Sequence, residues 1–159
     1  MDIEIISKPS FCVIGKRGRG PAGSGAAWIA PLWQNANEYI GEVLPLLYKD
    51  GEGRPTGIWG AMSDITGSFH PWGSEGLYLA GYEAPQSAEP PEGWVKWDIP
   101  AYTYAVASCT LAQYGEAFGH VLQEYLPQHG YELAGAVHEY YPQAGAPGSL
   151  QLWFPISRG

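Results

Sequence analysis

Basic side chains are scarce in this sequence. The 159 residues include 8 Lys and Arg against 16 Asp and Glu, which gives a formal net charge of −8 at pH 7. Four of the eight basic residues fall within the first 19 positions, so the rest of the chain is strongly acidic. Proteins that bind a nucleic-acid backbone neutralise its phosphates with Lys and Arg. We therefore expect no direct contact with nucleic acid.

Cysteines and long apolar runs are also few. Cys12 and Cys109 form no CxxC pair and the four histidines show no HExxH spacing, so we expect reduced, buried thiols, no metal and no cofactor. No apolar run approaches the roughly 18 residues of a membrane helix. The N-terminus, MDIEIISKPS, carries acidic residues where a signal peptide is basic. The expectation is a cytoplasmic protein without membrane contact.

Glycine, proline and aromatic residues are abundant. The chain holds 22 Gly and 14 Pro, dispersed rather than in repeats, together with 7 Trp, 11 Tyr and 4 Phe. The Gly and Pro content predicts many turns, and the aromatic content is too high for a disordered chain and predicts a folded one. A chain of this length forms one ordinary domain and is too short for two separate cores. We expect a single domain over residues 1–159.

The predicted elements occur in the same order twice. Apolar periodicity in the first half indicates a strand at 11–17, a helix at 26–48, and strands at 57–65 and 76–84. The second half repeats the pattern with a strand at 101–109, a helix ended by Pro127 and Gly130, and strands at 131–141 and 149–156. Pro9 and Pro100 precede the first strand of each half. The repeats span about 1–84 and 95–159, and the Pro- and Glu-rich stretch 84–93 is an exposed link.

This order predicts an α+β fold of two pseudo-symmetric strand-helix-strand-strand repeats. Short links between strands favour antiparallel pairing, and two helices with one apolar stripe each should cover one face of the combined sheet. The other face would then hold more aromatics than solvent tolerates, which favours an aromatic ligand groove there. The strand aromatics are Trp59, Tyr78, Tyr82, Tyr102, Tyr104, Tyr141 and Trp153. The loop 66–75, with Phe69, His70 and Trp72, can overhang such a groove, although an ordinary loop position is simpler for His70.

A literal G-x-G-x-x-G motif, Gly18, Gly20 and Gly23, follows the first predicted strand. In a dinucleotide-binding fold this motif needs parallel strands that alternate with helices, and an acidic residue at the end of the second strand. The acid at the right distance here, Glu38, lies inside a predicted helix, and two strands without a helix follow. We therefore interpret the motif as a turn.

Glu139 is the carboxylate whose position in the sequence says most about a ligand site. Strand alternation places Val137, Glu139 and Tyr141 on one face, so Glu139 lies either at a groove rim or inside a pocket. In an aromatic pocket it would suit cationic or electron-poor planar ligands, by charge pairing and cation–π contacts. Partial burial would also raise its pKa and make it usable as a general acid or base.

Several segments together resemble the GyrI-like small-molecule-binding domain, which includes the effector domains of BmrR-type and Rob-type transcription regulators. The resemblance covers essentially the whole chain, from Ile5 to Ile156. The segments that carry it are YLAGYE (78–83), WVKWDIPAYTYAVA (94–107), EYLPQHGYE (124–132), HEYYP (138–142) and LWFPI (152–156).

The resemblance implies a curved antiparallel sheet with the ligand groove opposite the helices. It also implies that Glu139 is the strand glutamate that binds cationic drugs and that Trp153 is the aromatic before the closing proline motif. By the internal repeat, Trp59 and Tyr78 would occupy the corresponding strands of the first half. No helix-turn-helix precedes the domain in this sequence, which puts direct transcriptional control in doubt.

Three function classes stay open. The first is binding or sequestration of aromatic, cationic or electrophilic small molecules in a groove formed by Glu139 and the aromatics named above. The second, implied by the resemblance, is a hydrolase that opens cyclopropane rings of DNA-alkylating natural products, with Glu139 activating water and Glu116 or Glu83 as the second acid. The third is an interaction protein, for example a gyrase inhibitor, although no partner surface is marked.

Overall fold

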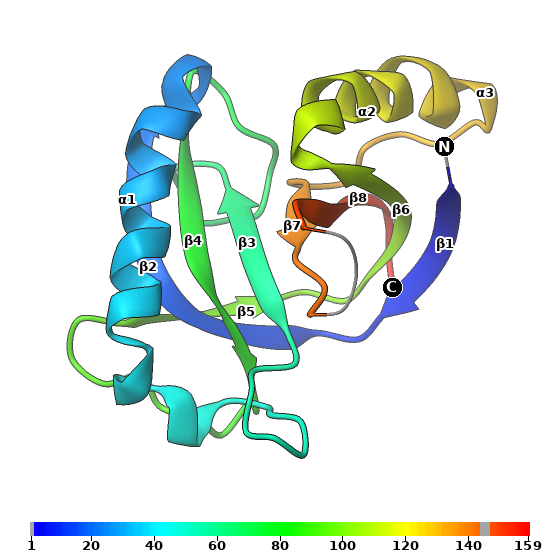
Figure 1. Cartoon of the computed structure of the whole chain (residues 1–159). Helices are drawn as coiled ribbons and strands as arrows, with labels where there is room; N and C mark the ends of the chain where they lie inside the picture. The colour runs from blue at the N-terminus through cyan, green and yellow to red at the C-terminus, as the bar shows by residue number, and fades with distance from the viewer. Residues whose placement is uncertain (1, 144–146) are drawn as a thin grey trace.

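The computed structural model describes residues 2–143 and 147–159. Two helical regions pack on one eight-stranded sheet (Figure 1). The strands of the first half are β1 (Ile3–Lys8), β2 (Phe11–Pro21), β3 (Ile58–Ser63) and β4 (Glu75–Ala84). Those of the second half are β5 (Val95–Ile99), β6 (Tyr102–Thr110), β7 (His138–Tyr140) and β8 (Ser149–Arg158). The eleven-residue strand expected at 131–141 is therefore only three residues long.

The helices are shorter and less regular than their apolar periodicity predicts. α1 (Gly25–Glu38) is followed by two 3-10 turns, Ile40–Glu42 and Leu44–Leu46, in the part of the predicted helix 26–48 where Pro45 was expected to bend or end it. In the second half, α2 (Tyr114–His120) continues through a π-helical segment, Val121–Tyr125, into the short α3 (Leu126–Gln128). Pro45 lies within the second 3-10 turn, where its missing N–H does not interrupt an α-helical hydrogen bond.

The strand order confirms the pseudo-symmetric repeat. It runs β1-β6-β8-β7-β3-β4-β2-β5, and every pair in it is antiparallel. Exchanging the halves, so that β1 becomes β5 and so on, gives the same order reversed. The first strand of each half, β1 or β5, was not expected, and each pairs with the other half. Because the described strands contain no parallel pair, a dinucleotide-binding fold is ruled out.

Both helices pack on the same face of the sheet. The register pairs Ala80 with Gly60, Gly60 with Glu139, Glu139 with Leu152 and Leu152 with Ala107, so these side-chain positions share a face. Ala80, at one end of this row, lies in the core beneath α1, and Ala107, at the other end, lies in the core beneath α2. Figure 1 shows α1 and α2 standing apart, with β3 and β7 between them.

The face opposite the helices is covered by the sheet's own strands, which bend over it. β2 and β6 are strongly bent (Figure 1), and their side chains close over the centre of this face to form a third core. Phe11 of β2 packs 4.9 Å from Trp59 of β3, and Tyr104 of β6 packs 5.2 Å from Trp153 of β8, measured between ring centroids. The aromatics that a flat sheet would leave exposed are thus buried by curvature.

Gly18 and Gly20 lie inside β2 rather than in the expected turn. Both pair with β4 in the antiparallel ladder. A Cβ atom at Gly18 would come within 2.7 Å of the Leu32 side chain, and one at Gly20 within 2.4 Å of Trp28. The two glycines therefore let α1 approach the sheet closely, which is a packing role and not a phosphate-binding one.

Candidate functional site

A large hollow beside Glu139 lies between α1 and the sheet, on the face that carries the helices. Its volume is about 890 Å³, within the usual range for small-molecule sites. It thus opens on the side of the sheet opposite to the one expected from sequence. We call it the glutamate cavity. Its aromatic and charged lining residues are Trp33, Trp72, Tyr78, Tyr114, Glu139 and Tyr141. Other residues of α1, including Gln34 and Asn37, complete the wall together with Ile58 and Met62 of β3 and Leu111.

Gly60 makes room for the carboxylate. β7 is only three residues long and pairs Glu139 directly with Gly60 of β3. A Cβ atom at Gly60 would lie 1.9 Å from the Tyr78 hydroxyl oxygen and 2.6 Å from Oε1 of Glu139. Only glycine therefore allows the Glu139 and Tyr78 side chains to meet over this strand.

Three phenols hold the Glu139 carboxylate. The hydroxyls of Tyr78 and Tyr141 donate to Oε1, the latter at 2.8 Å, and the hydroxyl of Tyr114 donates to Oε2. The indole Nε1 of Trp33 in turn donates to the Tyr78 hydroxyl at 3.0 Å. Glu139 is 7% exposed, so these neutral donors replace the water that it loses on folding.

The hydrogen-bond donors around Glu139 are neutral groups. Among the described residues, the five ion pairs are all formed elsewhere, and none includes Glu139. Burial, and after it the charge of Glu139, raises the pKa of Tyr78, Tyr114 and Tyr141 well above the ordinary value of a phenol. The phenols therefore remain protonated and act as hydrogen-bond donors at neutral pH.

His138 fixes the strand that carries Glu139. Its Nδ1 accepts a hydrogen bond from the Met62 backbone N–H at 3.1 Å, which extends the link between β3 and β7 beyond their two paired residues. The imidazole is fully buried, and burial lowers its pKa to about 3. A neutral His138 thus ties together the two strands on which the glutamate cavity is built.

Trp72 forms one side of the cavity from the loop between β3 and β4. Its ring stacks on Trp28 of α1 at 5.5 Å, and its Nε1 donates to the Leu77 carbonyl at 3.0 Å. The absence of a side chain at Gly76 lets the indole lie flat on the strand, since a Cβ atom there would come within 2.3 Å of it. Trp72 is therefore held firmly although it belongs to a loop.

The structure separates the aromatics that sequence analysis grouped together. Tyr78, Tyr141 and Trp72 line the glutamate cavity. Trp59 and Trp153 lie on the opposite face, 5.1 Å apart between ring centroids, because successive strand residues alternate sides. Tyr82 is buried beneath α1, with its hydroxyl donating to Asn37.

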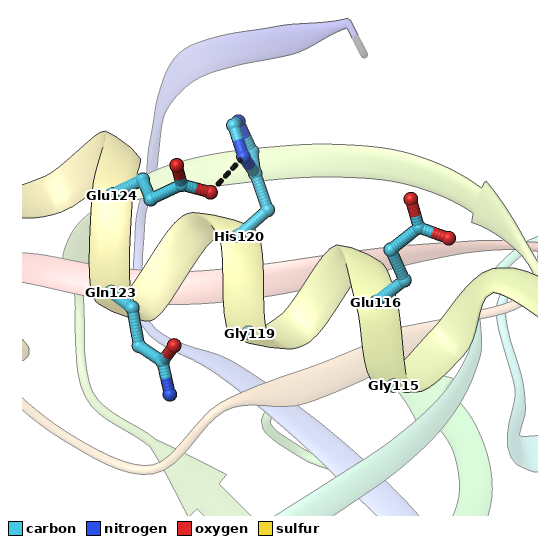
Figure 2. Close-up of a pocket in the computed structure, with 6 residues that line it drawn as sticks. All are labelled: Gly115, Glu116, Gly119, His120, Gln123 and Glu124. Carbon is cyan, nitrogen blue, oxygen red and sulfur yellow. Dashed lines mark hydrogen bonds and ion pairs between the residues drawn. The ribbon is translucent and has the colours of Figure 1, made fainter.

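The remaining candidates also lie away from Glu139. Phe69 packs on Trp97 at 5.6 Å, against the core of the opposite face. Glu83 accepts hydrogen bonds from Trp59 and Lys8 on that face. Glu116 lies on the outer side of α2, in a shallow hollow formed by that helix and the segment after it (Figure 2). Neither Glu83 nor Glu116 lines the glutamate cavity.

Two cavity residues, Trp33 and Tyr114, were not predicted as site residues. Tyr114 was assigned to the apolar stripe of the second helix, and Trp33 lies on the helix predicted at 26–48 without being singled out. A helical stripe cannot show which of its members meets the core and which meets a cavity, because both are apolar surroundings. Their indole N–H and phenol O–H groups, which require partners when buried, were the available signal.

Residues 2–143 and 147–159 contain neither a cluster of potential metal ligands nor a helix that could span a membrane. No group of three or more His, Cys, Asp or Glu side chains there is arranged to hold a metal ion. No helix in that part of the chain is long and apolar enough to cross a membrane.

The curved, pseudo-symmetric sheet and its cavity define a domain of the small-molecule-binding α+β class. Residues 1–157 match the GyrI-like small-molecule-binding domain, and the chain belongs to that family. It is 30% identical over 147 residues to the transcriptional regulator BrlR of Pseudomonas aeruginosa, a match that includes 90% of this chain. The chain spans about half the length of that relative, 49%.

Solved structures share the fold at low sequence identity. SAV2435 bound to tetraphenylphosphonium has a TM-score of 0.71 at 14% identity, with 99% of this chain and 94% of that chain covered. EcmrR in a complex with DNA has a TM-score of 0.66 at 16% identity, with 99% of this chain and 58% of that chain covered. At these identities the likeness establishes the fold alone.

Proposed function

We propose that the protein binds aromatic, lipophilic cations in the glutamate cavity and thereby sequesters them. The observation that carries this proposal is the buried carboxylate of Glu139, which is held by three neutral hydroxyls and by no cation among the described residues. A buried charge without an opposite charge is costly. A cationic ligand would supply the missing charge.

The surrounding rings support the same class of ligand. Trp33 and Tyr141 meet edge to face at 5.4 Å beside the carboxylate. Aromatic faces attract cations by roughly 0.5 to 2 kcal/mol per contact, the higher values applying to desolvated sites. A phenol that donates to a carboxylate becomes more electron-rich, which strengthens that attraction. The carboxylate of Glu139 and the aromatic surface of the cavity therefore both favour aromatic cations as ligands.

The comparisons support the proposal by fold. SAV2435, which shares the fold, has been solved with tetraphenylphosphonium, a lipophilic aromatic cation. The net charge of −8 also favours uptake of cations over contact with a phosphate backbone. We propose that any DNA contact in longer relatives is made outside the part that corresponds to this chain.

Hydrolysis receives less support from the cavity. Ring opening needs a proton donor beside the group that activates water, and the sequence-derived donors Glu83 and Glu116 lie elsewhere. The phenols that do contact Glu139 have raised pKa values, which makes them poor acids at neutral pH. We therefore propose binding without chemistry.

The test uses two ions of the same shape and opposite charge, tetraphenylphosphonium and tetraphenylborate. Calorimetric titration should show that Glu139→Gln weakens tetraphenylphosphonium binding by about 1 to 3 kcal/mol, the value of a charge-assisted contact. Tetraphenylborate should bind the variant at least as well as the original protein, because a repulsive charge is gone. Equal weakening of both ions would show that Glu139 is structural and would refute the proposal.

A further inference from the structure

A second hollow lies on the opposite face of the sheet, away from the helices. Its volume is about 460 Å³. It is lined by the end of β1, the segments around residues 48–49 and 56–57, and side chains of β3, β4, β7 and β8. We call it the lysine cavity. The side chains that matter for its chemistry are Lys8, Tyr48, Lys49, Trp59, Glu83 and Tyr140, and Trp153 is a further aromatic residue of its lining.

The charge of the lysine cavity is opposite to that of the glutamate cavity. Its lining includes two lysines, Lys8 and Lys49, and one carboxylate, Glu83. Both oxygens of Glu83 already have donors, because Trp59 Nε1 donates to Oε1 at 2.9 Å and Lys8 Nζ to Oε2 at 3.3 Å. Glu83 is therefore neutralised within the cavity, and the remaining charge is positive in a chain of net charge −8.

The ammonium groups retain unused donors. An ammonium carries three N–H bonds. Lys49 Nζ uses two of them on the carbonyls of Leu44 and Leu47, at 2.7 and 3.2 Å. Within the described part of the chain, Lys8 Nζ makes one hydrogen bond, to Glu83, and lies 4.5 Å from the Phe11 ring centroid. Both groups are thus held in place by the protein and can still donate to an anion.

Aromatic surface borders these donors. Trp59 and Tyr140 pack with centroids 4.8 Å apart, and the Tyr140 hydroxyl donates to the Thr56 carbonyl at 3.1 Å, which fixes the ring. Tyr48 is 48% exposed, and its backbone N–H donates to the carbonyl of Glu83 at 3.1 Å. A planar ring can therefore lie against Tyr140 and the exposed ring of Tyr48, and because Tyr140 is already held in place the entropic cost of binding is limited.

We propose that the lysine cavity binds aromatic carboxylates, with the carboxylate on Lys8 and Lys49 and the ring against Tyr48 and Tyr140. This site is independent of the glutamate cavity: it lies on the other face and selects the opposite charge. The one protein would then hold an aromatic cation and an aromatic anion at the same time.

The experiment titrates the full chain with 2-naphthoate and, as a neutral analogue of similar shape, 2-naphthylmethanol. Lys8→Met should weaken 2-naphthoate about fivefold or more, in line with a charge-assisted contact, and leave 2-naphthylmethanol nearly unchanged. Lys8→Arg should restore binding of the anion. Glu139→Gln should leave 2-naphthoate affinity unchanged, so that failure of this site is distinguishable from failure of the glutamate cavity.

The site is located by the indole N–H signals in NMR spectra. 2-Naphthoate should shift the signals of Trp59 and Trp153 and leave that of Trp33 unchanged. Lys49→Met serves as a second variant if thermal unfolding shows that Lys8→Met is damaged. Absence of saturable binding at low-millimolar 2-naphthoate, a shift confined to Trp33, or equal weakening of the neutral alcohol would each overturn the proposal.

Discussion

Replacing Gly60 with alanine should disrupt the hydrogen bonds that hold Glu139 in the glutamate cavity and destabilise the protein. The new methyl group would lie 1.9 Å from the Tyr78 hydroxyl oxygen, and ordinary contact begins near 3.4 Å, so the hydroxyl must retreat by about 1.5 Å. That movement breaks its hydrogen bond to Glu139. The added atom costs about 1 to 3 kcal/mol by overpacking, and the buried carboxylate that loses a donor costs a similar amount.

The expected total is a loss of about 2 to 6 kcal/mol in the free energy of unfolding, or roughly 4 to 24 °C in Tm for a chain of this size. Urea and thermal unfolding measure it directly. Gly119→Ala is the matched control, because a Cβ atom at Gly119 of α2 meets nothing within 4 Å. That variant should be unchanged or more stable by about 0.5 to 1 kcal/mol, since alanine favours helix.

A double variant tests whether Gly60→Ala destabilises the protein by displacing the Tyr78 hydroxyl. Tyr78→Phe removes the hydroxyl that the new methyl group displaces, so Gly60→Ala and Tyr78→Phe should together cost clearly less than the sum of the single changes. Contacting residues typically show coupling of about 0.5 to 3 kcal/mol in such cycles. Additive costs would refute the claim that Gly60 acts through the Tyr78 hydroxyl, even if Gly60→Ala is destabilising.

Two further predictions concern His138 and Trp72. The unfolded chain protonates His138 near pH 6.5, whereas burial lowers the folded pKa to about 3. Stability should therefore fall by up to about 1.4 kcal/mol per pH unit as the pH drops from 6.5 toward 4. Urea unfolding of His138→Gln should lose this slope between pH 6.5 and 5; an unchanged slope would contradict the assignment. Trp72→Ala should weaken tetraphenylphosphonium roughly fivefold to thirtyfold in calorimetric titration, from about 40 to 80 Å² of lost apolar contact, and unchanged affinity would remove Trp72 from the binding wall.

Local patterns in the sequence were sufficient to predict the internal repeat and the antiparallel pairing of the strands. The strands at 57–65 and 76–84 and the position after Pro100 were located to within a few residues. β1 and β5 were not, because each is short and pairs with the other half, so no neighbouring segment of the chain indicates its partner. Pairing between distant segments is a property of topology rather than of local composition.

The site was harder to predict than the fold. Alternation correctly placed Glu139 and Tyr141 on a common side, and their hydrogen bond at 2.8 Å joins them. The groove was expected on the face opposite the helices because the argument treated the sheet as flat, whereas the glutamate cavity lies on the helix face. Sheet curvature depends on the bending of β2 and β6, and it buries Trp59 and Trp153 against Phe11 and Tyr104. A count of aromatics contains no information about that bend.

The pairing of Gly60 with Glu139 has a consequence for the history of the two halves. In the first half, Lys16 pairs with Ala80 and Ala80 with Gly60; in the second, Ala107 pairs with Leu152 and Leu152 with Glu139. Lys16 and Ala107 are separated by the same distance along the chain as Pro9 and Pro100. Gly60 is therefore the repeat equivalent of Glu139, and the two face each other across the pseudo-two-fold axis.

At that axis, identical halves could not form this site. Two glutamates would place like charges directly opposite each other, which destabilises a strand pair, and two glycines would leave no charge. A symmetric dimer of either half could build the sheet but not the phenol-bound carboxylate. The cavity depends on repeat halves that carry different residues at this position, so that one half supplies the anion and the other supplies the space for it.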